Sequence, residues 1–156
     1  MKKALKKFTI FTILICTIFV VTACSKKVIT ANDFKKIMDS KGYEVVDVTS
    51  QFASQGTMKK GYVALNKNHT YQVEFFELKD KETAESMFET NKKRFENKKG
   101  KSSVETNVNV GNYSKYTLSS GGRFKVITRV ENTLLYLDVD KNYKDEVGKI
   151  IDKLGY

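Results

Sequence analysis

Two cysteines, Cys16 and Cys24, are the only thiols in the chain, and the position of Cys24 suggests covalent chemistry. Four lysines near the start precede an apolar run from Phe8 to Val21, and Cys24 follows that run within three residues. A basic start, a short apolar middle and a small residue before the cut are typical of an export signal. The sequence therefore predicts that residues 1–23 are removed and that Cys24 becomes the first residue of the exported chain.

The residues at this cut resemble the lipobox of bacterial lipoproteins, which reads aliphatic, small or hydroxyl, small, then cysteine: Val21, Thr22, Ala23 and Cys24. The resemblance covers residues 1–24. It implies that a transferase attaches diacylglycerol to the Cys24 sulfur and that a dedicated peptidase recognises Val21, Thr22 and Ala23. The chain would then resemble small cell-surface lipoproteins of Gram-positive bacteria, held on the outer face of the cytoplasmic membrane.

Two other interpretations of the apolar run stay open. It could be an uncleaved anchor helix, although about 14 residues at about 1.5 Å each reach only about 21 Å of a roughly 30 Å hydrocarbon core. It could also be an ordinary signal peptide with a cysteine after the cut by chance. Under the lipobox interpretation residues 24–29 form a short tether, and residues 30–156 form a single domain without cysteine.

Other residues that could do chemistry lack the partners that it would need. His69 is the only histidine, and it lies in a predicted turn. The run from Asp138 to Asp145 begins like an EF-hand calcium loop, but Tyr143 stands where the turn glycine belongs and Lys149 where the bidentate glutamate belongs. We therefore predict no catalytic residue, metal site or cofactor, and we interpret Asp140 or Asn142 as a helix cap.

A basic cluster lies at the end of a predicted long helix. Its members are Lys92, Lys93, Arg94, Lys98, Lys99 and Lys101. A solvated helix end explains it simply, since cations suit the carboxyl end of a helix. The alternative is contact with anionic lipid headgroups or a wall polymer. Residues 24–156 hold 24 basic and 18 acidic residues, which supports attraction to anionic surfaces, while an exported protein is a poor candidate for nucleic-acid binding.

Hydrophobic periodicity predicts an α+β fold. Thr30, with Asp33 three residues later, resembles the capping box of a first helix that ends near Gly42, and Asp80 resembles the cap of a second. The expected helices are 30–42, 80–98 and 142–154; the expected strands are 43–48, 61–65, 70–78, 104–110, 113–118, 123–130 and 134–139, with a loop at 49–60.

These elements predict an antiparallel sheet with about three helices packed on one face and the other face partly open. A duplicated helix-plus-meander unit is one explanation for two helices that both end in Gly-Tyr, at Gly42 and Gly155. If the strand 113–118 is regular, Tyr113 and Tyr116 point to opposite faces, so that one of them is exposed. The open sheet face is the expected binding surface.

Three functions fit these features. The first is a non-enzymatic binding module, anchored at the membrane, that acts on a protein or an envelope polymer. The second is an inhibitor or immunity-type lipoprotein that blocks an enzyme at the membrane. The third is a hydrolase with an unrecognised site.

Overall fold

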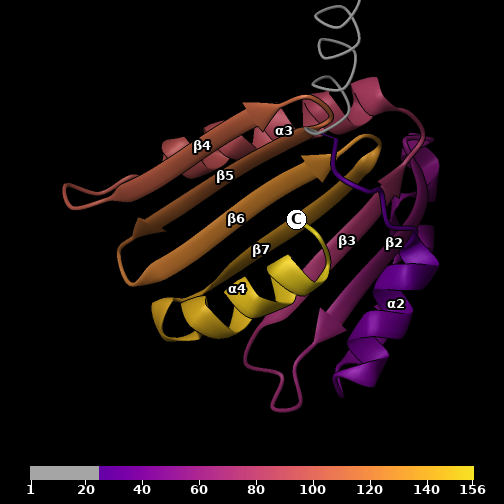
Figure 1. Ribbon diagram of the computed structural model, residues 1–156, viewed down its shortest axis with the longest axis horizontal. Coiled ribbons are helices and arrows are strands. Elements are labelled where there is room, and N and C mark those ends of the chain that lie inside the picture. The colour runs from indigo at the N-terminus through magenta and orange to yellow at the C-terminus, as the bar shows by residue number, and fades with distance from the viewer. Residues whose placement is uncertain (1–24) are drawn as a thin grey trace, which may run out of the picture.

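A seven-stranded antiparallel sheet forms the centre of the molecule (Figure 1). The structure, a computed structural model, describes residues 25–156, so the predicted signal and Cys24 lie outside the described residues. The strand order is β1-β2-β3-β7-β6-β5-β4, which is two meanders joined where β3 pairs with β7. The strands are β1 (Glu44–Asp47), β2 (Met58–Leu65), β3 (Gln72–Leu78), β4 (Val104–Val110), β5 (Tyr113–Ser120), β6 (Arg123–Val130) and β7 (Thr133–Asp140).

The helices begin where the sequence predicts caps. They are α2 (Ala31–Ser40), α3 (Lys81–Glu96) and α4 (Lys144–Lys153), with short 3-10 helices η1 (Thr49–Gln55) and η2 (Lys141–Tyr143). Thr30 and Asp33 form the predicted capping box, and Asp80 accepts a hydrogen bond from the Thr83 N–H. Asp140 caps η2, which leads directly into α4. Each cap gives a hydrogen-bond partner to a helix N–H group that otherwise has none.

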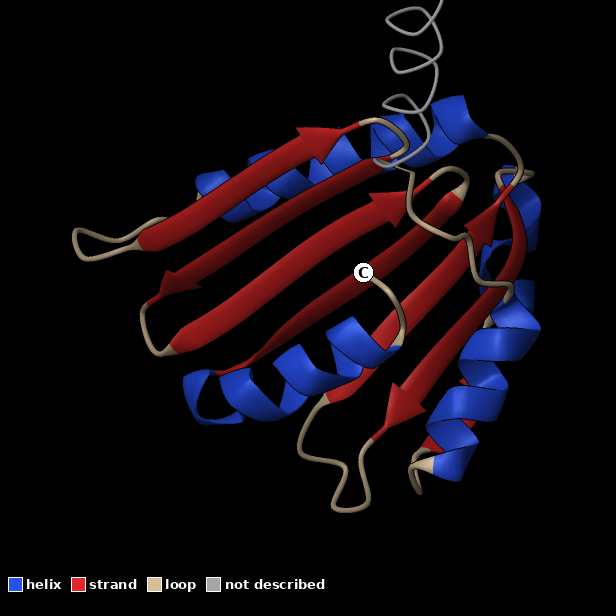
Figure 2. Cartoon of the chain, viewed as in Figure 1, coloured by secondary structure: helices blue, strands red, loops and turns tan. Residues whose placement is uncertain are grey.

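The α+β class and the antiparallel sheet are confirmed, but the helices do not share one face. Figure 2 shows α2 and α4 in front of the sheet and α3 behind it. Phe34 of α2 and Ile151 of α4 join one core cluster, whereas Phe88 and Phe95 of α3 join a second cluster on the opposite face. Along the central strands apolar side chains point to both faces of the sheet, so each face needs to be covered.

The Gly-Tyr repeat is explained by a shared helix ending. Gly42 and Gly155 both have positive φ, and the following tyrosine N–H bonds five residues back in each case, to Met38 and to Ile151. This is a Schellman cap, which needs a residue that tolerates the left-handed conformation. In a duplicated helix-plus-meander unit, a two-fold axis perpendicular to the sheet would relate the antiparallel strands β3 and β7. Such an axis would keep α2 and α3 on the same face of the sheet. They lie on opposite faces, so this arrangement is not found.

Burial of both faces also changes the expectation for the two tyrosines. Tyr113 is 9% exposed in one cluster and Tyr116 is 1% exposed in the other. They do point to opposite faces, as predicted, but neither is free for a ligand to stack on. The predicted loop at 49–60 instead contains η1 and the first residues of β2, 58–60. Within residues 25–156 no helix is both long and apolar enough to cross a membrane.

Candidate functional site: the tether dock and the Arg129 cavity

The predicted tether is bound to the domain. The side chain of Asn112, in the turn between β4 and β5, accepts a hydrogen bond from the Lys26 N–H at 2.9 Å and donates one to the Lys26 carbonyl at 2.8 Å. The Lys26 Nζ donates to the Gly155 carbonyl at 3.0 Å and lies 4.3 Å from the centre of the Tyr113 ring. We call this set of contacts the tether dock. It leaves Ser25 as the only described residue before it.

The tether dock defines one end of the sheet. The β6–β7 turn lies beside it, because the Glu131 N–H donates to the Asn112 carbonyl at 3.0 Å. Strand β3 also ends here, where the Leu78 N–H donates to the Asn132 carbonyl, and α3 starts three residues later. We call this the tether end of the molecule.

The predicted basic cluster lies at the opposite end. Helix α3 runs away from the tether end for 16 residues, which is about 24 Å at about 1.5 Å per residue. The Gly100 N–H beyond α3 donates to Ser120, next to the β5–β6 turn. Within the cluster Lys99 pairs with Glu105, while Lys93 and Arg94 are exposed at the carboxyl end of α3. The basic cluster and the tether dock therefore lie at opposite ends of the molecule.

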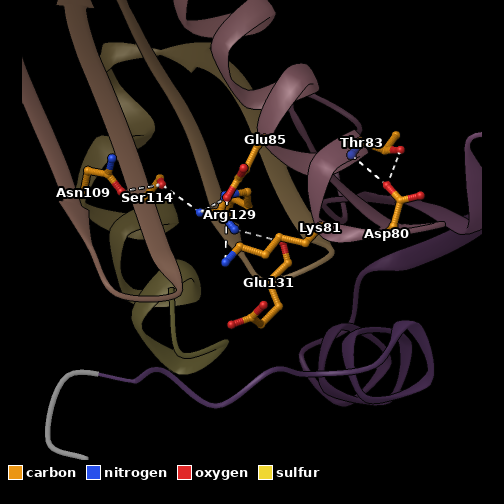
Figure 3. Close-up of polar contacts among 8 residues, drawn as sticks. All are labelled: Asp80, Lys81, Thr83, Glu85, Asn109, Ser114, Arg129 and Glu131. Carbon is orange, nitrogen blue, oxygen red and sulfur yellow. Dashed lines mark hydrogen bonds and ion pairs between the residues drawn. The ribbon is translucent and has the colours of Figure 1, made fainter. Parts of the chain in front are cut away.

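A cavity of about 390 Å³ opens at the tether end, between α3 and the β4–β5 hairpin. Figure 3 shows Glu85 reaching from α3 towards Arg129 of β6, with Ser114 and Asn109 on the other side. We call it the Arg129 cavity. Its lining residues are Glu85, Phe88, Glu89, Asn109, Gly111, Ser114 and Arg129.

Arg129 is a buried cation with incomplete partners. Its side chain is only 4% exposed. Nη1 donates to the Glu131 carbonyl at 3.1 Å, and Nη2 donates to the Ser114 hydroxyl at 3.3 Å. The only carboxylate in contact, among the described residues, is Glu85, with Oε1 3.3 Å from Nη2. Nε is buried and has no hydrogen-bond partner among residues 25–156.

This arrangement is costly for the free protein. A buried charge needs close partners, and an unpaired buried donor costs roughly 1–3 kcal/mol. Glu85 is a weak counterion because its side chain is 48% exposed and its contact is long for a charge-assisted bond. Its Oε1 also lies 3.9 Å from the Lys81 Nζ, one turn earlier on α3. The cavity can therefore accept an anionic group that replaces Glu85.

A second hollow lies on the part of the α3 face that the helix leaves uncovered. Glu74 and Tyr136 are shared by two adjoining depressions of about 380 and 310 Å³. Phe76 and Leu134 contribute to an apolar floor. Burial raises the pKa of Glu74 above its ordinary value, since only the Gln72 amide is bonded to it and stabilises its charge. This shallow groove is what remains of the predicted open face.

The remaining sequence candidates have structural partners. His69 pairs with Glu44 at 2.9 Å on the surface. Asp138 accepts hydrogen bonds from Lys125 and Arg123; burial disfavours its charge, but those cations hold the pKa of Asp138 below its ordinary value. In the described part of the chain no three His, Cys, Asp or Glu side chains gather where a metal ion could bind.

Arg129 and Asn112 were not singled out by sequence reasoning. Arg129 is one of three charged residues that alternate along β6 with apolar residues, which is the ordinary pattern of a half-exposed strand. One signal pointed the other way. Ile127 lies on the same face of β6 as Lys125 and Arg129, so that face is not purely polar. In the structure this face is covered by α3.

No protein-family model matches the chain, and no curated protein matches it either. Among solved structures, the crystal structure of a GTP-binding regulator from Thermotoga maritima is similar to it. The two chains are 17% identical with a TM-score of 0.48, and the match covers 81% of this chain and 87% of the other. A likeness at that identity concerns the fold, and we infer nothing from it about binding.

Proposed function

We propose that the chain is a membrane-anchored extracytoplasmic lipoprotein whose domain is a non-enzymatic binding module. Residues 1–23 are the signal, Val21, Thr22 and Ala23 are read by the peptidase, and Cys24 carries the diacylglyceryl group. The domain then faces outwards from the cytoplasmic membrane. Its ligand site is the Arg129 cavity, and further contacts with a protein or an envelope polymer come from the surfaces that face away from the membrane.

The observation that carries this proposal is the tether dock. A lipidated Cys24 would be separated from the docked Lys26 by Ser25 alone, and one extended residue spans at most about 3.6 Å. The tether end would therefore be held against the lipid headgroups. A tether whose backbone N–H and carbonyl are both bonded to the domain suits a protein that works at a fixed distance from the membrane.

The same geometry favours one of the two anionic surfaces that the basic cluster could meet. At about 24 Å from the tether end it lies more than two Debye lengths away, since that length is about 8 Å at physiological salt. The lipid charge is largely screened over that distance. A wall polymer that extends past the domain can reach the cluster, so we assign Lys92, Lys93, Arg94, Lys98, Lys99 and Lys101 to polymer contact rather than to lipid headgroups.

Inhibition of a protein partner is the second candidate, because one edge of the sheet is open. Within the described residues 25–156, strand β4 pairs only with β5, and it exposes Val104 at 70% and Val110 at 46%. An unpaired edge strand with exposed valines can add a strand from another protein. Changing both valines to lysine should abolish in-cell crosslinks from β4 to that partner, and crosslinks that persist unchanged would remove this candidate.

The anchor is tested by the intact mass of the mature N-terminus. The chain purified from membranes should begin at Cys24 with a diacylglyceryl group on its sulfur. Cys24→Ser should give an unlipidated, uncut precursor. Cys16→Ser is the matched control, because it removes the other thiol and should leave processing unchanged. An unmodified Cys24 in the mature natural chain would refute the anchor.

A further inference from the structure

We propose that the Arg129 cavity binds a zwitterionic head, in which an oxyanion meets Arg129 and Ser114 and an ammonium group meets Glu89. This inference rests on the proposed function as a binding module and names its ligand class. It starts from an unusual combination, a nearly buried guanidinium with an unpartnered Nε beside a cavity of about 390 Å³.

The oxyanion half follows from the geometry of the guanidinium. Arginine presents its donors in a planar fork that fits a carboxylate or a phosphate with two parallel hydrogen bonds. In the part of the chain that the structure describes, Nε is free and Nη2 has only long contacts, at 3.3 Å to Ser114 and 3.3 Å to Glu85. An oxyanion that binds Nε and Nη2 together satisfies the orphaned donor. It can also accept a hydrogen bond from the Ser114 hydroxyl when that hydroxyl turns away from the Asn109 Oδ1, to which it donates at 3.1 Å.

Glu85 acts as a stand-in for that oxyanion in the free protein. Its carboxylate, on a half-exposed side chain, contacts the buried guanidinium. When a ligand displaces it, Glu85 does not become an isolated charge, because the Lys81 Nζ is already 3.9 Å from Oε1 at the i,i+4 spacing. Ligand binding therefore replaces the Arg129–Glu85 ion pair with one between Arg129 and the ligand, and it leaves Glu85 paired with Lys81.

The ammonium half follows from the charge balance. Two carboxylates, Glu85 and Glu89, and one guanidinium line the cavity, so it has an excess negative charge. A bare anion would increase that excess, and a bare cation would leave the Arg129 Nε without a partner. A zwitterion adds no net charge. Its oxyanion is a partner for the Arg129 Nε, and its ammonium group is a partner for Glu89, which lies one helical turn beyond Glu85. The cavity volume lies within the range of small-molecule pockets.

Two sources could supply such a head. A free α-amino acid carries a carboxylate and an ammonium group, and an ethanolamine phospholipid carries a phosphate and an ammonium group. The tether end places the cavity beside the membrane under the proposed function, so both sources are within reach. The shared chemistry is an oxyanion and an ammonium group a few bonds apart, and the experiment separates the two sources.

The chain offers an unusually simple spectroscopic probe. It has only three arginines, Arg94, Arg123 and Arg129, so ¹⁵N-arginine labelling gives three Nε–H signals in a ¹H–¹⁵N NMR spectrum. The full chain is purified from membranes in dodecyl maltoside, whose head is uncharged, and the Arg129 signal is assigned as the one lost in Arg129→Lys. O-Phosphoethanolamine and L-alanine are the two zwitterionic probes. Ethylammonium, acetate and inorganic phosphate are the half-ligand controls.

We expect the Arg129 Nε–H signal to move and saturate with at least one zwitterion, while the signals of Arg94 and Arg123 stay in place. A response to O-phosphoethanolamine alone assigns the lipid-type head, and a response to L-alanine alone assigns the amino acid. The half-ligands should bind about threefold more weakly, since each lacks one of the two ion pairs and an exposed ion pair contributes a factor of about that size.

Glu89→Gln is the decisive variant because Glu89 is exposed and its change should leave the fold intact. It should weaken the zwitterion about threefold and tighten inorganic phosphate. Glu82→Gln is the matched control, with the same charge change on the same helix but outside the cavity, and it should change neither affinity. No response to either zwitterion would overturn the proposal, and so would a phosphate affinity equal to the zwitterion's together with an unchanged Glu89→Gln variant.

This test is independent of the anchor. The Nε–H titration reports on the cavity whether or not Cys24 carries lipid, and the mass of the N-terminus reports on the anchor whether or not the cavity binds. A lipidated chain with an unresponsive Arg129 would refute the ligand class alone, and a responsive Arg129 in an unlipidated chain would refute the anchor alone.

Discussion

Asn112→Ala should release the tether from the domain. The Asn112 side chain makes two hydrogen bonds to the backbone of Lys26, at 2.9 and 2.8 Å, and alanine makes neither. A neutral hydrogen bond contributes about 1 kcal/mol net, so the pair should contribute about 2 kcal/mol to docking. The Lys26 Nζ contacts with Gly155 and Tyr113 remain, but they hold only a long flexible side chain.

Hydrogen exchange at the Lys26 amide measures this directly. A loss of about 2 kcal/mol corresponds to about 30-fold less protection. Asn112→Asp keeps the acceptor oxygen and loses the donor, so it should fall in between. Asn107→Ala, an exposed asparagine on the neighbouring strand, is the control. If the Lys26 amide exchanged as fast in the natural chain as in Asn112→Ala, the tether would not be docked and the reasoning would fail.

Three further predictions concern stability. Phe34→Ala should destabilise the fold by about 3–5 kcal/mol in urea unfolding, because Phe34 is fully buried and its ring stacks on Phe75 with centroids 4.9 Å apart; a cost near zero would contradict that packing. The hydrogen bonds from Lys60 and from the hydroxyl and N–H of Thr49 lower the pKa of Asp47 from 3.8 to about 2, so the stability that the Asp47 carboxylate contributes should be complete above pH 3.8 and lost as the pH falls towards 2, and Asp47→Asn should flatten this part of the pH–stability curve. Gly155→Ala should cost about 1 kcal/mol by thermal unfolding, since φ is +83° and there is open space for the methyl group, so only backbone strain opposes it; an unchanged midpoint would argue against the left-handed cap.

Local features of this chain were readable from its sequence because their causes are local. The Thr30–Asp33 capping box, the Asp80 cap and the glycine ending of α2 depend on residues within one turn of each other. The alternation of apolar and polar residues in the strands is equally local. Each predicted strand is present, and its ends lie within a few residues of the predicted ones. The 3-10 helix at 49–55 was missed because its sequence is polar and lacks a helical apolar period.

The site could not be predicted because its residues meet only through the sheet order. Arg129, Ser114 and Glu85 come from β6, β5 and α3, and nothing in the sequence states that α3 lies over β6. Asn112 and Lys26 are 86 residues apart along the chain and meet at the tether end. Long-range pairing depends on the whole fold, so a strand arginine that seems solvated can be buried.

The sequence by itself determined the α-helices and strands, the α+β class and the expectation of a lipid anchor at Cys24, since each depends on neighbouring residues. Only the tertiary structure decided the rest. It placed α3 on the face opposite α2 and α4, because both sheet faces are apolar and each needs a cover. That choice buried Tyr116 and Arg129 and created the cavity in which Arg129 lacks a full set of partners among the described residues.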